Sequence, residues 1–317
     1  MYRFTILIFI ALTLFTAPIV SGNNQVQSTQ PEITEGKKAI VLGRVSDNPK
    51  KHMAQLQSIA DYVASKLVSH GITHGKVVIA KDNRQLINLL KQGRVDWISE
   101  TPFSATLYED QSLAEIILLR WKKGVSRYRT IFITRKDSGI EKLEDLVGKK
   151  IAFEDPGSTS GFYVPAGLLL QEKLQLTELP SARDAAPEHV VGYIFSRAEM
   201  NISTLVFRRL VDAGTMSNLD WHESDRVHEK MKKELKIFYE SQDIPRALEL
   251  VRKDLDPSLK KALTSVLIEA HEDPEAEVAL KNYKKTKRFE IIDKNLRSEI
   301  DTIRKLRLIV SEELVQF

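Results

Sequence analysis

Hydrophobic and polar residues alternate along the chain in blocks that predict strands followed by helices. Short, nearly continuous apolar runs are typical of buried strands, and such runs occupy residues 38–45, 76–80 and 95–99. The segments His52–Leu67 and Asn83–Gln92 carry apolar side chains at the spacing of a helix face. Pro102 suits the first turn of a further helix, because its missing N–H is not needed there. Three β-α units in succession favour a mostly parallel sheet with helices on both faces.

The alternation resumes after Leu118 and predicts a second α/β unit. Its predicted strands are residues 128–135, 150–153, 190–195 and 211–215. A further strand is expected at 237–240, after the character of the chain has changed. Its predicted helices are residues 140–146, 160–173 and 202–210. The segment Asp225–Lys236 is rich in charge, and residues 256–317 have a mostly helical pattern. No period of about 20–50 residues recurs, which argues against a solenoid.

Composition places the chain among globular proteins. Of its 317 residues, 42% are hydrophobic and 28% are charged, which excludes a disordered chain and a polytopic membrane protein. The length fits about two domains. A net charge of +4 over this length gives no reason to expect nucleic acid as a partner. Cysteine is absent, so disulfides, thiolate metal sites, a cysteine nucleophile and an acylated cysteine anchor are excluded.

The first residues have the pattern of an export signal. Residues 1–22 combine Arg3 near the start, an apolar stretch over 4–15 and small residues towards the end. We therefore expect a signal peptide at 1–22 and a flexible polar segment at 23–37, ahead of a soluble, exported protein. An uncleaved membrane anchor is the alternative, although the apolar stretch is short for a hydrocarbon core of ~30 Å.

The segment Lys150–Leu168 carries most of the candidate chemistry. A predicted strand runs into the tight turn Asp155–Gly157, and the hydroxyl residues Ser158, Thr159 and Ser160 follow before an apolar helix. Three hydroxyls, together with the unpaired N–H groups and the dipole of a first helical turn, can form a cradle for an anion. The alternative is that one serine only caps the helix. The absence of lysine from the turn suggests an anion that is held by neutral donors and can be released.

Enzyme motifs fail when their positions are checked. The run Gly157–Gly161 has Thr159 at the position of the nucleophilic serine of an esterase elbow, so it does not match that motif. No P-loop and no G-x-G-x-x-G occurs. We therefore expect a binding protein that is not an enzyme and needs neither a cofactor nor a metal. A hydrolase on an α/β scaffold remains the alternative, because catalytic triads are assembled in space rather than in sequence.

The run Asp155–Phe162, followed by Pro165, resembles the signature of the PhnD-like phosphate, phosphite and phosphonate substrate-binding proteins of ABC transporters. Weaker pieces of the same resemblance occur in the same order as in that family. They are residues 93–96, 100–105, 128–148, 210–214, 243–245 and 252–268. The resemblance extends from Lys38 to the mid-270s.

The resemblance implies an α/β protein with the type II periplasmic-binding fold. In that fold two lobes close on a ligand and two crossover strands form the hinge. The first lobe is expected at 38–120 plus 225–317 and the second at 121–224. The crossovers are then expected near 122–127 and 217–239.

The resemblance also implies a function and a set of ligand-binding residues. The ligand would be a small oxyanion, phosphate-like or phosphonate-like, and the partner a permease of an ABC transporter in the membrane. A periplasmic sensor that signals to a membrane kinase or cyclase is the alternative. The protein is expected to be a periplasmic monomer. The residues expected to contact the ligand are Ser158, Thr159, Ser160, Glu100, Ser46, Thr101, Ser104, Tyr128 and Thr215.

Three positions depart from the pattern of the aminophosphonate-binding relatives. Glu100 stands where they have an aromatic residue, Ala198 replaces a histidine, and Ala247 or a neighbour replaces a carboxylate. A carboxylate near an expected anion is unfavourable unless it is protonated or accepts a hydrogen bond from the ligand. We hypothesise that Glu100 selects a protonated ligand such as hydrogen phosphate. Alternatively, Glu100 points to solvent or caps the helix that begins at Pro102.

Overall fold

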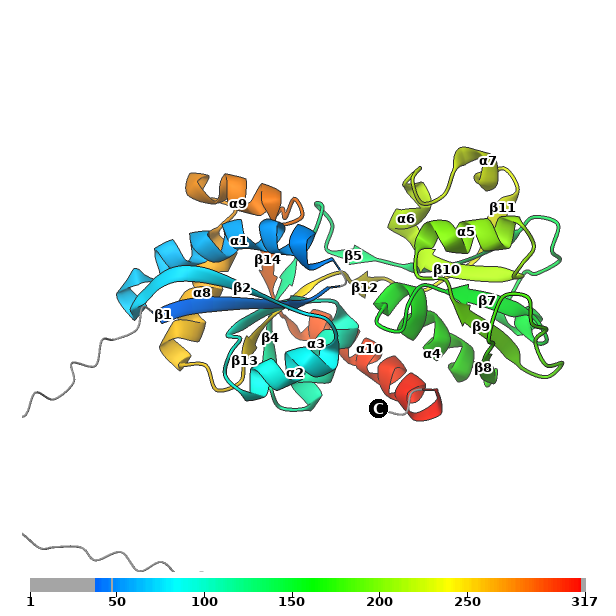
Figure 1. The fold of residues 1–317 in the computed structure, drawn as a ribbon, viewed down its shortest axis with the longest axis horizontal. Helices are drawn as coiled ribbons and strands as arrows, with labels where there is room; N and C mark the ends of the chain where they lie inside the picture. The colour runs from blue at the N-terminus through cyan, green and yellow to red at the C-terminus, as the bar shows by residue number, and fades with distance from the viewer. Residues whose placement is uncertain (1–37, 47, 315–317) are drawn as a thin grey trace, which may run out of the picture. The chain divides into compact units, whose positions relative to one another are not determined.

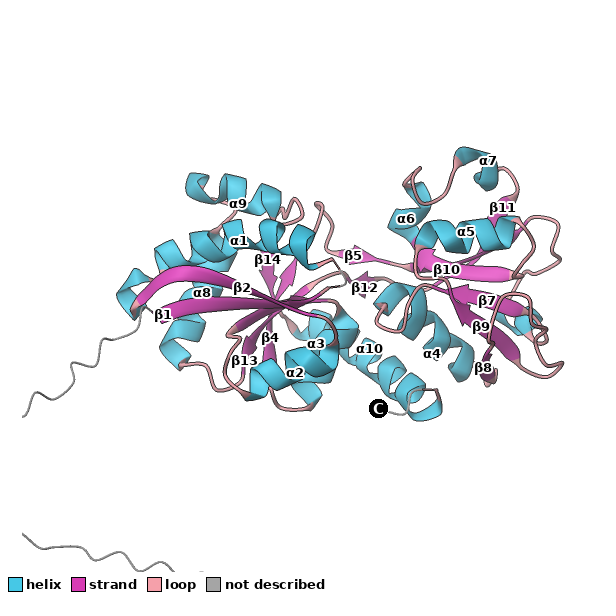
Figure 2. Cartoon of the chain, viewed as in Figure 1, coloured by secondary structure: helices cyan, strands magenta, loops and turns pink. Residues whose placement is uncertain are grey.

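The computed structural model describes residues 38–46 and 48–314. The expected signal peptide at 1–22 and the expected polar segment at 23–37 lie outside the described residues. Among the helices of the described part, none has both the length and the apolar character needed to cross a membrane. The described residues form two six-stranded sheets and one two-stranded sheet, with helices on their faces (Figures 1 and 2).

The first sheet, with the helices that cover it, forms lobe 1. Its strands, in spatial order, are β14 (Phe289–Ile291), β4 (Ala114–Arg120), β13 (Leu248–Arg252), β3 (Trp97–Glu100), β1 (Lys38–Val45) and β2 (Ile72–Ala80). The parallel pairing of β1 with β2 and β3 confirms the expected parallel arrangement. The three remaining strands were not predicted, and β13 runs antiparallel to both β3 and β4.

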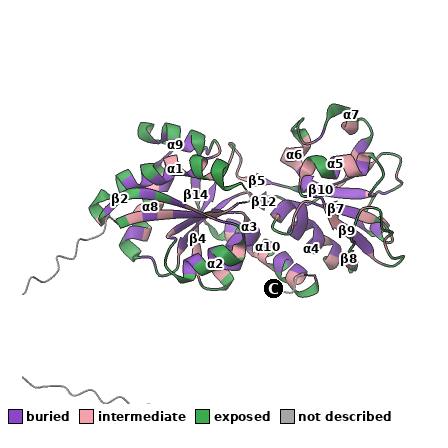
Figure 3. Cartoon of the chain, in the orientation of Figure 1, coloured by how far each residue is buried: buried purple, intermediate pink, exposed green. Residues whose placement is uncertain are grey.

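Two layers of helices cover lobe 1. Their bounds are α1 (Pro49–Lys66), α2 (Asn83–Lys91), α3 (Pro102–Asp110), α8 (Pro257–Glu269), α9 (Glu277–Asn282) and α10 (Lys294–Glu313). One core lies between the sheet and α1, α8 and α9, and the other between the sheet and α2, α3 and α10. In α1 the buried residues Leu56, Ile59 and Val63 recur at helical spacing, which is why this face packs on the sheet. Figure 3 shows the buried strands between helices with exposed outer faces.

The second sheet forms lobe 2. Its strands, in spatial order, are β11 (Leu235–Glu240), β6 (Thr130–Arg135), β10 (Ala213–Ser217), β7 (Lys150–Phe153), β9 (Val191–Phe195) and β8 (Leu176–Glu178). The helices are α4 (Val164–Gln171), α5 (Glu199–Phe207), α6 (Asn218–His222) and α7 (Glu229–Lys232). Each strand predicted in this region is present, and its bounds differ from the predicted ones by a few residues at most. The predicted helix at 140–146 is only a 3₁₀ turn, Leu143–Leu146.

Two short strands connect the lobes. β5 (Arg127–Tyr128) pairs antiparallel with β12 (Ile244–Pro245). The first connection lies next to the expected crossover at 122–127. The second follows β11, which pairs with β6, so the second sheet continues past the boundary expected at 224/225. The reason is that Leu235 and Ile237 alternate onto the core of lobe 2, a signal that the surrounding charged residues concealed.

Candidate ligand-binding site

The three hydroxyl residues 158–160, here called the hydroxyl loop, follow β7 and its turn. Ser158 accepts a hydrogen bond from the N–H of Gly161 at 2.9 Å and so caps the next turn. That turn, Thr159–Tyr163, is π-helical, and the regular helix α4 begins at Val164. The helix expected at 160–173 therefore starts with a wider turn. Such single π turns are often found at functional sites.

The buried hydroxyl of Thr159 connects the loop to helix α3 of lobe 1. Its Oγ1 atom accepts a hydrogen bond from the N–H of Phe103 at 3.1 Å. The rings of Phe103 and Tyr163 stack beside it, with centroids 3.6 Å apart and planes 13° apart. The hydroxyl loop and the N-terminal turn of α3 are therefore in direct contact. These are the two elements in which the sequence predicted most of the ligand contacts.

The other buried hydroxyls of the site support the backbone of the loop. Thr130 donates to the carbonyl of Ser160 at 2.9 Å, and Thr215 donates to the carbonyl of Gly161 at 3.0 Å. Tyr128, in β5, is buried and its hydroxyl interacts with the side chain of Ser160. Burial raises the pKa of Tyr128 to about 12, so the phenol stays protonated at neutral pH. Thus Ser160, Thr215 and Tyr128 meet around one loop.

A carboxyl group that the sequence analysis did not single out also contacts the hydroxyl loop. Ser158 donates a hydrogen bond to Oε2 of Glu154 at 2.6 Å. Burial, followed by the negative charge of Glu199, raises the pKa of Glu154 to about 8. Glu154 is therefore mostly neutral at pH 7 and adds little repulsion against an anion at the loop. In the sequence, only the position of Glu154 directly before the turn Asp155–Gly157 indicated that this residue could lie at the site.

Glu100 ends β3 and is buried rather than directed to solvent. Its Oε1 atom accepts from the N–H of Val45 at 2.7 Å, and its Oε2 atom accepts from the N–H of Thr101 at 3.3 Å. Burial raises the pKa of Glu100, and the positive charge of Arg44 opposes this change. Thr101 is the N-cap residue of α3, so Glu100 contacts the start of this helix as well as the end of β1.

The remaining predicted site residues lie in lobe 1 near Glu100. Ser46 directly follows Val45, accepts from the N–H of Asn48 at 2.9 Å and also hydrogen-bonds His52. Ser104, in α3, donates to Oδ1 of Asn83 at 3.1 Å. Both serine hydroxyls are thus already engaged within lobe 1. The predicted residues form two groups, one around Glu100 and one around the hydroxyl loop, which meet at α3.

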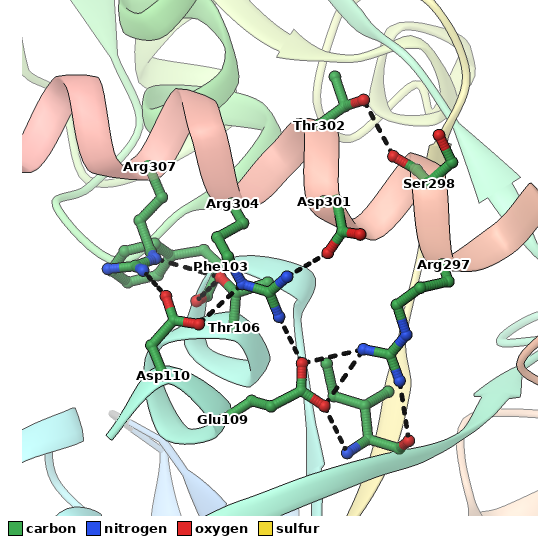
Figure 4. Close-up of polar contacts among 11 residues, drawn as sticks. Phe103, Thr106, Glu109, Asp110, Arg297, Ser298, Asp301, Thr302, Arg304 and Arg307 are labelled. Carbon is green, nitrogen blue, oxygen red and sulfur yellow. Dashed lines mark hydrogen bonds and ion pairs between the residues drawn. The ribbon is translucent and has the colours of Figure 1, made fainter. Parts of the chain in front are cut away.

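Helix α3 is held in place by the C-terminal helix α10 (Figure 4). Arg297 lies 2.9 Å from Glu109, and Arg304 pairs with both Glu109 and Asp110. Arg307 pairs with Asp110 and donates to Thr106 at 3.2 Å, the latter bond being buried. Because three arginines of one helix share two carboxylates of the other, the orientation of α3 depends on α10.

Apolar residues of α10 pack on lobe 2 and on the hinge strands. Ile303 and Leu306 join Val164 of α4 and the hinge residues Tyr128 and Ile244 in one apolar cluster. The helix therefore contacts both lobes, with charged side chains on α3 and apolar side chains on α4. Among residues 38–46 and 48–314, no group of three or more His, Cys, Asp or Glu could hold a metal ion.

Comparison with known proteins identifies the family. Residues 42–296 match the family described as ABC transporter, phosphonate, periplasmic substrate-binding protein. The chain belongs to that family. This confirms the resemblance carried by the run Asp155–Phe162. The fold is the expected type II periplasmic-binding fold, as in solved binding proteins of phosphonate and sulfonate transporters.

The chain is similar to two proteins of known structure and to one curated protein. XAC2383 from Xanthomonas citri, solved with a chloride ion and with ATP, is 33% identical, with a TM-score of 0.82. The ATP-bound structure aligns over 87% of this chain and 99% of that one. PhnD1 from Prochlorococcus marinus, in complex with methylphosphonate, is 17% identical over 85% of this chain and 98% of that chain, with a TM-score of 0.62.

The third relative is the phosphate-import protein PhnD of Mycolicibacterium smegmatis. It is 27% identical over 166 residues, which are 51% of this chain and 50% of that protein. The chain therefore aligns with about half the length of this curated relative.

Proposed function

We propose that this chain is a periplasmic solute-binding protein that binds an oxyanion between the hydroxyl loop and the start of α3. The observation that carries the proposal is the 3.1 Å hydrogen bond from the Phe103 N–H to Thr159 Oγ1. It places a helix N-terminal amide and a hydroxyl side by side, and both are donors of the kind that hold an oxyanion. Family membership supports the proposal, as do the anionic ligands of XAC2383.

Binding at this position would be reversible, because neutral donors hold the anion and no bond is broken. Hydroxyl and amide donors replace the water that an oxyanion loses, while a neutral Glu154 avoids a repulsive charge. A ligand that contacts both the loop in lobe 2 and α3 in lobe 1 stabilises the arrangement in which they touch. The hinge strands β5 and β12 allow the lobes to separate and release it.

A thermal-shift and calorimetry series tests the binding step. We expect phosphate, methylphosphonate or a related oxyanion to raise the unfolding midpoint of the purified protein by mass action. The variant Thr159→Val keeps the shape of the side chain and removes the hydroxyl, so it should weaken binding by about tenfold or more. Thr159→Ser should retain most of the affinity. The matched control Thr177→Val, on the edge strand β8, should bind like the wild type.

The proposal fails if no oxyanion changes the unfolding midpoint or produces a heat of binding. It also fails if Thr159→Val and Thr177→Val bind equally well. Because Thr159→Val leaves the Phe103 N–H without its acceptor, a fall in stability alone is not evidence about the ligand. The ratio of affinities between Thr159→Val and Thr159→Ser is therefore the deciding quantity.

The proposed partner is the permease of an ABC transporter, which would receive the ligand from the closed form. Deletion of the gene in its host should lower the uptake of the labelled ligand. Unchanged uptake, together with a changed output of a membrane kinase or cyclase, would assign the protein to sensing instead.

A further inference from the structure

Four cationic side chains from distant parts of the sequence meet beside the candidate site. They are named here the basic cluster and consist of Arg44, Lys122, Arg246 and Lys284. Arg246 Nη1 donates to the carbonyl of Lys122 at 2.6 Å. The N–H of Lys123 donates to the carbonyl of Lys284 at 3.0 Å, which brings the segment after α9 against the segment after β4. Each of the four residues is half-buried and keeps part of its surface exposed to solvent.

The charges of the basic cluster are poorly compensated. In the described residues, none of the four cations has a carboxylate oxygen within 4.0 Å, whereas the neighbouring Lys123 lies 3.3 Å from Glu223. The Nε atom of Arg44 is buried without a hydrogen-bond partner. Burial lowers the pKa of Lys122 well below its usual range, and the charges of Arg44 and Arg120 lower it further. A group of like charges in one place is unfavourable unless an anion joins it.

The basic cluster adjoins the proposed anion site on two sides. Arg44 precedes Val45, whose N–H binds Glu100, and the charges of Arg44 and Lys122 both act on that carboxyl. On the other side, the charge of Arg246 acts on Tyr128, whose hydroxyl interacts with Ser160. A path of neighbouring groups therefore leads from the hydroxyl loop, through the hinge strand β5, to the basic cluster.

The charges of Arg44 and Lys122 act on the carboxyl group of Glu100, which cannot balance four cations by itself. It carries at most one negative charge, and its burial favours the neutral form. Several neighbouring cations match a ligand that carries several negative charges, since each charge-assisted contact is stronger than a neutral hydrogen bond. A single phosphate at the hydroxyl loop would leave most of the cluster without a partner.

We propose that the basic cluster binds a second anionic group of the ligand whose first group lies at the hydroxyl loop, an inference that rests on the proposed function. The ligand class is then a molecule with several phosphate groups in a row, such as a polyphosphate or a nucleoside polyphosphate. A lone phosphate or a simple alkylphosphonate would bind more weakly, because it reaches only the hydroxyl loop.

Calorimetry with inorganic phosphate, tripolyphosphate and ATP tests this inference on the full chain. Tripolyphosphate or ATP should bind at least about tenfold more tightly than phosphate. Lys122→Gln should lower the affinity for tripolyphosphate and for ATP by about tenfold. The affinity for phosphate should change by less than about twofold. Equal binding of tripolyphosphate and ATP identifies the phosphate chain as the recognised group, while tighter binding of ATP adds a contact to the nucleoside. The exposed control Lys149→Gln removes the same charge elsewhere and should change none of these affinities.

A second measurement keeps the test independent of ligand choice. Without ligand, Lys122→Gln should raise the unfolding midpoint, because it removes an amine whose charged form is opposed by burial and by the neighbouring cations, whereas a lower midpoint would mean a structural role. Arg44→Gln serves as the second variant if Lys122→Gln does not fold. If phosphate binds while tripolyphosphate and ATP bind no tighter, the inference is overturned and the proposed function stands. If no anion binds, both are overturned.

Discussion

Two neighbouring groups of charged side chains differ in how their charges are compensated. In the first group, Arg120 lies 3.0 Å from Glu249, and Trp97 and Tyr283 donate to the same carboxylate at 2.6 and 2.9 Å. In the second, the basic cluster, no carboxylate of the described residues lies at ion-pair distance from its four cations. The first group contains an ion pair within the protein, whereas no ion pair of the second lies among the described residues. The proposed ligand contact at the basic cluster rests on this difference in pairing.

The two groups also differ in how far their side chains are exposed to solvent. Arg120 and Glu249 are almost fully buried, and Tyr283 also stacks under the guanidinium, 4.1 Å from its centre. An unpaired charge there would be very costly, so every polar atom needs a partner. The residues of the basic cluster keep part of their surface exposed to water. Burial also lowers the pKa of Lys122 and of Lys284, which reduces the positive charge that lacks an ion pair.

The largest expected effect comes from breaking the paired group. Glu249→Ala leaves Arg120 buried without its partner and adds a further unbalanced charge beside Lys122. We expect the free energy of unfolding to fall by about 3–5 kcal/mol. Denaturant unfolding measures the change, and Glu275→Ala, which breaks the surface pair with Lys66, should cost less than about 1 kcal/mol. Similar losses in the two variants would contradict the expected difference between a buried pair and an exposed pair.

An intermediate effect is expected from the carboxyl group at the hydroxyl loop. Because the pKa of Glu154 is raised to about 8, the group is neutral below that pH and charged above it. Anion affinity in the wild type should therefore fall by about tenfold as the pH rises from 7 to 9. In Glu154→Gln the affinity should stay level over this range. Calorimetry at several pH values distinguishes the two, and parallel profiles would exclude Glu154 as the titrating group.

The raised pKa of Glu154 also predicts how the stability of the protein changes with pH. The folded state holds the proton on this carboxyl up to pH 8, while the unfolded chain releases it near the ordinary value of 4.5. Stability contributed by the neutral group is thus lost as the pH rises between these values. The wild type should lose stability relative to Glu154→Gln over this range in unfolding experiments.

The smallest expected effect concerns Lys284, a residue of the basic cluster, and the change of stability with pH. Burial, and then the charge of Arg44, lowers the pKa of Lys284 from 10.5 to about 8. The unfolded chain therefore binds more protons than the folded one between pH 8 and 10.5, and stability rises with pH in this window. After screening by solvent we expect a gain of about 0.5 kcal/mol relative to Lys284→Gln. The exposed neighbour Lys285, changed to glutamine, should track the wild type in the same unfolding series.

Much of lobe 2 could be predicted because its elements carry local signals. The apolar run at Lys150–Phe153 forms β7 as predicted. The strand β11 was predicted only in part, and its place in the second sheet was missed. The reason is that the alternating apolar residues Leu235 and Ile237 lie among charged residues, which hide the pattern. In lobe 1 the unpredicted strand β13 inserts between β3 and β4, far from both in sequence.

The candidate site could be predicted only as a set of separate residues. The run Ser158–Ser160 and its turn were visible, since capping and turn residues act over a few positions. The contact of Thr159 with Phe103 was not, because it joins residues 56 positions apart. The raised pKa of Glu154 was equally invisible, since it depends on burial and on the charge of Glu199.

The sequence by itself determined the alternation of strands and helices, the family signature at residues 155–162 and the absence of cysteine chemistry. These follow from spacing and residue type, which act locally along the chain. Only the tertiary structure decided which charges of the described residues form ion pairs and which do not. Arg44, Lys122, Arg246 and Lys284 meet through the order of strands in lobe 1 and the position of the hinge, and neither is encoded in a short segment.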